Sequence, residues 1–224
     1  LTALKAAAAA TIMAWVKVES QGGSGVNRRV LGLSGNVAAA NVRISISQLG
    51  AATTDSWRLN ARRLDADSLH TRDIVTSVTL STSHLAIVCD YTGGTSTFYI
   101  NGASVGSGSV AGWAAACSNT ASLGSAIGVT TDLASQFFDG LIADARVYNR
   151  ALTALEISHI YGSKGRDSIM RSLVHRWPMN EGAIGATVSG SGSVKDKCGN
   201  ANGTATASPV YSDWIAYPRR KRRG

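Results

Sequence analysis

The stretch from Phe138 to Tyr148 is the part of this sequence that most restricts the fold. Its side chains alternate, which predicts a β-strand because successive side chains of a strand point to opposite faces of a sheet. One predicted face carries Leu141, Ala143, Ala145 and Val147, and the other carries Ile142, Asp144, Arg146 and Tyr148. The segment therefore belongs in a sheet.

The periodicity changes directly after this strand. Thr153 is followed three residues later by Glu156, the spacing of a capping box at a helix start. Apolar side chains at Ile157 and Ile160, with Tyr161, then share one helical face, and Gly162 is the expected stop. We therefore expect one short amphipathic helix from residue 153 to 162, which follows the strand after a short connection.

This strand and helix resemble the closing segment of laminin-G-like domains in the concanavalin A-like lectin/glucanase superfamily, which reads F-x-G-x-I-D-E-V-R-I-Y-N-R-A-L-S-x-x-E-I. The matching residues are Gly140, Ile142, Arg146, Tyr148, Asn149, Arg150, Ala151, Leu152, Glu156 and Ile157. The resemblance implies an all-β fold, a two-sheet antiparallel β-sandwich of the jelly-roll type with one or two short helices.

Composition agrees with such a sandwich. Apolar residues make up 44% of the 224 residues and charged residues only 16%, while 24 glycines suit short strands joined by tight turns. Alternating or apolar segments predict further strands at residues 11–18, 29–33, 42–46, 56–61, 74–80, 85–89, 97–105 and 121–128. Asn101-Gly102 predicts a tight hairpin turn, and residues 106–112 are expected to be loop.

The C-terminal part holds a second resemblance. Residues 173–204 are similar to the family's opening segment, L-V-x-x-W-x-L-D-E-G followed by D-x-S-G-N-G-N-x-G. We divide the chain into a sandwich at 1–162, an extension at 163–217 that begins with a short helix at 167–173, and a basic tail at 218–224. The extension either completes its own sandwich, which the short linker favours, or adds a strand to a neighbouring subunit.

No catalytic constellation is evident, and we expect no enzyme. Hydrolysis of glycosides requires two nearby carboxylates, yet the chain has only Glu19, Glu156 and Glu181 as glutamates, with Glu156 assigned to the capping box. Asp65 and Asp67 are close in sequence, but a loop is their expected setting. The four histidines lack the spacing of metal ligands.

Calcium is the one cofactor that the family resemblance implies. Asp196 matches the D-x-S-G-N pattern, and carboxylate oxygens are the ligands that calcium prefers. The family's second aspartate is Ala143 here, so Asp139 or Asp144 would have to replace it. These three aspartates form the candidate calcium site.

Aromatic residues offer a candidate glycan site. Trp57, Trp113 and Tyr91 can form a platform on which a sugar ring stacks. The alternative, which we favour, is that these large side chains fill the sandwich core.

Charge is concentrated at the C-terminus. Arg219, Arg220, Lys221, Arg222 and Arg223 supply five of the eight net positive charges, which leaves +3 for the rest of the chain. The tail is either a solvated end or an arm that binds an acidic surface. The cysteines Cys89, Cys117 and Cys198 are expected to be free thiols, with a Cys89–Cys117 bridge as the alternative.

The apolar run from Ala6 to Val16 is too short to span a bilayer and lacks a cleavage site, so we predict neither membrane insertion nor a signal peptide. Leu1 suggests that upstream residues are missing.

Two functions follow from these resemblances. The first is a non-enzymatic structural and adhesion module on a virion surface, because the body, extension and basic end look like bacteriophage virion proteins: a capsid decoration, head fibre or tail-associated protein. It would contact other protein subunits in an oligomer or virion, and also cell-surface glycans. The alternative is a soluble or secreted lectin that binds glycans through calcium or aromatic rings. The expected location is a virion or the extracellular space.

Overall fold

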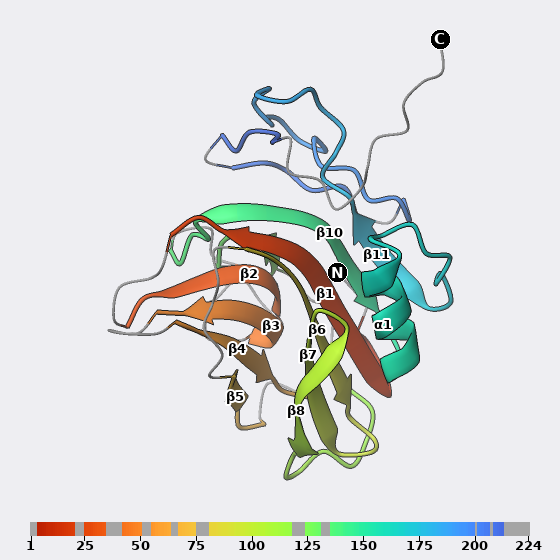
Figure 1. The fold of residues 1–224 in the computed structure, drawn as a ribbon. Helices are drawn as coiled ribbons and strands as arrows, with labels where there is room; N and C mark the ends of the chain where they lie inside the picture. The colour runs from red at the N-terminus through yellow and green to blue at the C-terminus, as the bar shows by residue number, and fades with distance from the viewer. Residues whose placement is uncertain are drawn as a thin grey trace.

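A computed structural model gives the architecture of the chain (Figure 1). It describes residues 4–20, 25–34, 42–50, 55–63, 67–74, 81–117, 124–130, 135–199, 201–206 and 208–212. The strands in this part are β1 (Ala9–Val18), β2 (Asn27–Ser34), β3 (Val42–Leu49), β4 (Ser56–Ala61), β5 (His70–Ile74), β6 (Thr82–Asp90), β7 (Thr95–Ile100), β8 (Ala103–Ser109), β9 (Gly124–Ile127), β10 (Gly140–Tyr148) and β11 (Leu173–Trp177), with the helix α1 (Ala154–Gly162).

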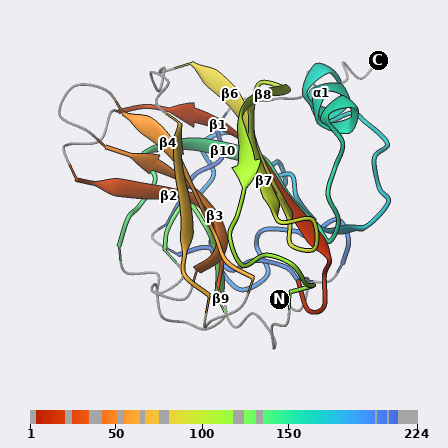
Figure 2. The same cartoon turned by 90° about the horizontal axis from the view of Figure 1, so that it is seen from below.

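The strands form two sheets. The first has the order β11-β10-β1-β6-β7-β8, the second β5-β4-β3-β2-β9, and neighbouring strands are antiparallel throughout. Figure 2 shows the two sheets in cross-section, with α1 on the side of the six-stranded sheet that faces away from β2, β3 and β4. The predicted all-β, two-sheet antiparallel sandwich is confirmed.

The two faces of β1 explain this layering. Ile12, Ala14 and Val16 point into the core between the sheets, whereas Met13 and Trp15 point outward. The outward residues are covered by the segment that includes α1, whose Ile157 and Ile160 belong to the same apolar cluster as Met13. A strand that is apolar on both faces is expected where both faces are buried.

The capping box at the start of α1 is confirmed. The backbone N–H of Glu156 donates to Thr153 Oγ1 at 3.2 Å, and the N–H of Thr153 donates to Glu156 Oε2 at 2.9 Å. Gly162 is the last residue of the helix rather than its stop, because Ser163 is the C-cap and the left-handed residues Lys164 and Gly165 turn the chain away.

The tight turn at Asn101-Gly102 is also confirmed, with φ angles of +53° and +81° at the two residues that link β7 to β8. The loop expected at 106–112 is wrong in its first half, because β8 continues to Ser109. Of the strand expected at 74–80, residues 75–80 lie outside the described residues.

A β-bulge corrects the alternation predicted for β10. Met13 pairs with Arg146 but Trp15 pairs with Ala143, so two residues of β10 oppose Ala14. One of them, Asp144, has a φ of +48°. Ala143 therefore packs against Trp15 on the outer face of the sheet, and the prediction that it shares a face with Ala145 is wrong.

The helix predicted from Asp167 to Leu173 is also wrong. The segment is irregular until β11 begins at Leu173, because side chains of β10 bind its polar groups. Tyr148 Oη donates to the carbonyl of Ile169 at 2.9 Å, and the guanidinium of Arg146 donates to both oxygens of Asp167 at 3.0 and 2.9 Å.

The C-terminal extension supplies β11, which pairs with residues 145–148 of β10 in the same chain. Beyond it, residues 178–199, 201–206 and 208–212 form what we call the cover, in which isolated antiparallel bridges join Thr187 to Val210 and Val194 to Gly203. The domain boundaries at 162 and 217 stay a prediction.

Candidate binding pocket

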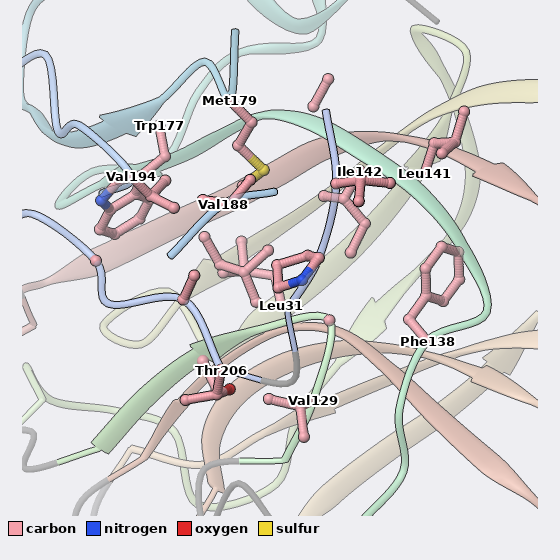
Figure 3. Close-up of a pocket in the computed structure, with 18 of the residues that line it drawn as sticks. Leu31, Val129, Phe138, Leu141, Ile142, Trp177, Met179, Val188, Val194 and Thr206 are labelled. Atoms are coloured by element: carbon pink, nitrogen blue, oxygen red, sulfur yellow. The ribbon is translucent and has the colours of Figure 1, made fainter. Parts of the chain in front are cut away.

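The sandwich is open along one side near the start of β10. The register of β11 on β10 ends at Ala145, and β9 is the last strand of its sheet. The cover lies over this gap and encloses a cavity of about 440 Å³ between itself, β9 and β10 (Figure 3). Cavities of roughly 300–1,000 Å³ are the size of small-ligand sites.

Apolar side chains from both sheets and from the cover make up most of the wall. Their sources are β2 and β9 with the turn after it, the start of β10, and the cover with the end of β11; Figure 3 shows ten of the lining residues by name. The apolar lining comprises Leu31, Ala126, Ile127, Val129, Phe137, Phe138, Leu141, Ile142, Ala143, Trp177, Met179, Val188, Val194, Ala205, Pro209 and Val210.

Polar groups are fewer and uncharged. The lining has hydroxyls at Ser125, Thr204, Thr206 and Ser212 and the phenol of Tyr211, and none of its residues is an Asp, Glu, Lys, Arg or His. Such a surface can contact an apolar ring face and exchange hydrogen bonds with hydroxyls, but the lining residues in the described chain contain no carboxylate for general acid or base catalysis.

Trp177 lines the cavity, and its ring is fixed by two contacts. Its indole Nε1 donates to the carbonyl of Ala201 at 2.8 Å, and its ring stacks on His175 at a centroid distance of 5.1 Å. The indole N–H is therefore used within the protein, and the ring supplies an apolar wall.

Asp196 anchors the cover to β11. Its two oxygens accept from the backbone N–H groups of Arg176, Cys198 and Ala201 at 2.9–3.0 Å and from His175 Nδ1 at 2.8 Å. Burial opposes the ionised carboxylate, but these donors hold the pKa of Asp196 below its ordinary value.

A buried ion-pair network ties the chain before β11 to the bulge of β10. Arg146 donates to Asp144 at 2.6 Å and to Asp167 at 2.9 Å, and Arg176 Nε donates to Asp144 at 2.7 Å. Burial disfavours the ionised form of both carboxylates, yet the positive charges and hydrogen bonds of the arginines hold the pKa values of Asp144 and Asp167 below their ordinary value.

The three candidate calcium ligands serve other partners here. Asp196 accepts the four hydrogen bonds above, Asp144 is paired with two arginines, and Asp139 accepts from the hydroxyl of Ser20. No group of three or more His, Cys, Asp or Glu side chains that could hold a metal ion occurs in the part of the chain that the structure describes. The arrangement lends no support to calcium binding, which stays a prediction.

The three aromatic residues of the predicted glycan platform lie inside the sandwich. Trp57, Trp113 and Tyr91 are only 2%, 5% and 0% exposed and belong to the main core cluster, where no sugar can reach their faces. Other aromatic residues, which were not predicted from the sequence, line the cavity: Phe137, Phe138, Trp177 and Tyr211. The adjacent aromatic residues Phe137 and Phe138, directly before β10, were the sequence signal that could have indicated this site.

The remaining predicted features lie elsewhere. The basic residues Arg219–Arg223 and Asp65 are outside the described residues. All three cysteines are free thiols, and burial raises the pKa of the Cys89 thiol, as does the nearby Cys117. Among the described residues, no helix has the length and apolar character needed to cross a membrane.

Comparison with solved structures reveals the same fold in other proteins. A candidate carbohydrate binding protein from Bacteroides ovatus superposes with a TM-score of 0.69 and 16% identity over 93% of this chain, which spans 55% of that protein. The CBM40 of the Ruminococcus gnavus IT-sialidase, bound to α2,3-sialyllactose, has a TM-score of 0.54 and 17% identity. The match covers 70% of this chain and 84% of the CBM40 chain. A heptameric SAP-like pentraxin from Limulus polyphemus has a TM-score of 0.54 and 18% identity, and the match covers 73% of this chain and 74% of the pentraxin chain.

At these identities the likeness shows the fold alone. No curated protein sequence matches the chain. A family model described as the concanavalin A-like lectin/glucanases superfamily matches residues 2–158, well over half of the sequence. The chain therefore belongs to the concanavalin A-like lectin/glucanases superfamily.

Proposed function

We propose that this protein is a non-catalytic carbohydrate-binding module whose sugar site is the cavity under the cover. The observation that carries the proposal is the cavity itself, which combines aromatic rings with uncharged hydroxyls at the open side of the sandwich. Its size, about 440 Å³, suits one or two sugar rings better than a folded protein partner.

The chemistry of the lining matches the two kinds of surface on a sugar. A pyranose ring has an apolar C–H face, which packs on aromatic side chains, and a rim of hydroxyls, which need hydrogen-bond partners. Phe137, 50% exposed, and Tyr211 offer aromatic surface, while Thr204 and Thr206 offer hydroxyls. Two of the similar structures, from Bacteroides ovatus and Ruminococcus gnavus, are described as binding carbohydrate, which supports the same role here.

The virion-surface role, with its capsid, fibre or tail partners, stays a prediction from the sequence. No feature of the described residues favours it over the lectin alternative. The same holds for assembly into an oligomer, for an acidic partner of the tail, and for a virion or extracellular location.

A glycan array probed with the full chain tests the proposal. We expect binding to a defined set of glycans, and we expect Phe137→Ala to weaken it because the substitution removes the most exposed aromatic ring of the lining. Leu155→Ala is the matched control, since Leu155 is an 80% exposed apolar residue on α1, away from the cavity. Stacking on one ring contributes about 0.5–1.5 kcal/mol, so affinity should fall about two- to tenfold.

The proposal fails if no glycan binds, or if F137A and L155A bind every positive glycan as tightly as the unmodified protein. Binding that disappears with a chelator and is unaffected by F137A would instead favour the predicted calcium site.

A further inference from the structure

We infer that the cavity selects an uncharged sugar that presents an apolar substituent, such as the C6 methyl of a 6-deoxyhexose, to the cavity wall. The inference rests on the proposed function and names the class of sugar that the same site takes. Three observations carry it: the absence of charged side chains from the lining, the negative charge of Glu181 beside Tyr211, and the apolar wall.

A charged sugar would find no counter-ion among the lining residues. The described lining contains no arginine, lysine or histidine that could pair with a carboxylate. A carboxylate moved out of water without a partner loses much of its solvation energy, so uronic and sialic acids are disfavoured.

One charged side chain beside the lining has the wrong sign for binding an acid. Glu181, whose Oε1 accepts from the N–H of Lys195 at 3.2 Å, lies near enough to Tyr211 to act on its phenol. Burial and then Glu181 raise the pKa of Tyr211, so the phenol is a neutral hydrogen-bonding group at the cavity. A sugar carboxylate beside Tyr211 would be repelled by Glu181.

The sandwich and the cover together form an apolar wall of the cavity. Leu31, Ile127 and Ile142 come from the sandwich, and Met179 and Val188 come from the cover. Figure 3 shows Met179, Val188 and Ile142 grouped around the same space as Leu31. A sugar hydroxyl turned toward this wall would lose its water partners, whereas a methyl group would gain contact.

Two series of methyl glycosides that differ only at C6 test the inference by isothermal titration calorimetry. The galacto series is D-galactose, D-fucose and D-galacturonate, and the gluco series is D-glucose, 6-deoxy-D-glucose and D-glucuronate. In the series that binds, we expect the 6-deoxy sugar to bind at least about fivefold tighter than the parent hexose, because the parent must bury its C6 hydroxyl without a hydrogen-bond partner. The uronate should bind at least about tenfold more weakly than the parent.

Paired lysine variants locate the effect. Thr206→Lys places a cation on the lining, and we expect it to tighten uronate binding. Thr187→Lys is the control, because Thr187 is an exposed residue of the same cover outside the lining. Equal responses of the two variants would overturn the assignment to this cavity.

A uronate that binds as tightly as its parent, or a parent hexose that binds as tightly as the 6-deoxy sugar, overturns the inference and leaves the proposed function standing. Failure of all six sugars also overturns it, and the glycan array then decides separately whether the protein binds carbohydrate.

Discussion

Substitution of Asp196 by alanine should release the cover without unfolding the sandwich. Asp196 is 5% exposed and its carboxylate accepts four hydrogen bonds, three of them from the backbone N–H groups of Arg176 in β11 and of Cys198 and Ala201 in the cover. Alanine leaves these donors without a partner. Hydrogen bonds to a charged group contribute about 1.5–3 kcal/mol, and partial rescue by water reduces the total, so we expect a loss of about 3–5 kcal/mol.

The loss should be local. Hydrogen exchange followed by mass spectrometry should become faster in residues 178–212, while peptides from β1 and β6 in the centre of the sheet stay protected. Asp196→Asn is the control, because its amide oxygen can keep some of the four bonds, and it should fall between D196A and the unmodified protein.

The pH dependence provides an independent check. The pKa of Asp196 is lower in the folded state than in the unfolded chain, so its contribution is present above pH 4 and is lost as the pH falls through the folded value. D196A should therefore lack this part of the acid destabilisation. The reasoning would be refuted if D196A lowered stability by less than about 1 kcal/mol, or if its hydrogen exchange became faster uniformly along the chain. A chelator that destabilises the unmodified protein as much as D196A does would show instead that Asp196 binds a metal.

Three further predictions concern the sheet and its helix. Burial, followed by the charge of Arg146, lowers the pKa of His84 to about 4, so only the unfolded chain takes up this proton between pH 6.5 and 4. The free energy of unfolding should fall by about 3 kcal/mol over that range in urea titrations, and His84→Gln should flatten the slope; an unchanged slope contradicts the assignment. Arg146→Met should cost about 3–5 kcal/mol in chemical denaturation because Asp144 and Asp167 stay buried, and adding D144N and D167N should recover part of the loss; a cost under about 1 kcal/mol would count against the network. Thr153→Ala should cost about 1 kcal/mol in thermal unfolding followed by circular dichroism, whereas T153S should match the unmodified protein.

Local signals predicted the parts of the fold that depend on a few adjacent residues. The capping box needs only Thr153 and Glu156, and the β7–β8 turn needs only Asn101-Gly102, so their chemistry can be read from sequence. The sandwich follows from many such segments together. The helix expected from Asp167 failed because Arg146, twenty-one residues earlier, binds the Asp167 carboxylate, and no local rule contains that contact.

The binding pocket could not be predicted because its walls are far apart in sequence. Leu31, Ile127 and Met179 meet only after both sheets have formed and the cover has folded over them. Residue type alone also could not tell an exposed ring from a buried one. Trp57 and Phe137 are both large aromatic residues in this chain, yet their exposures are 2% and 50%.

The end of β11 links the ion-pair network to the pocket. Pro178 follows the last residue of β11 and has no N–H to continue the ladder, but its carbonyl accepts from the N–H of Asp144 at 3.3 Å. Asp144 is the bulged residue, with a φ of +48°, and its carboxylate is held by Arg146 and Arg176. The bulge therefore marks the point where β11 stops accompanying β10 along its edge. Because pairing stops there, β11 leaves residues 140–143 to line the pocket, and the arginines that neutralise Asp144 bind the chain at the edge of this opening.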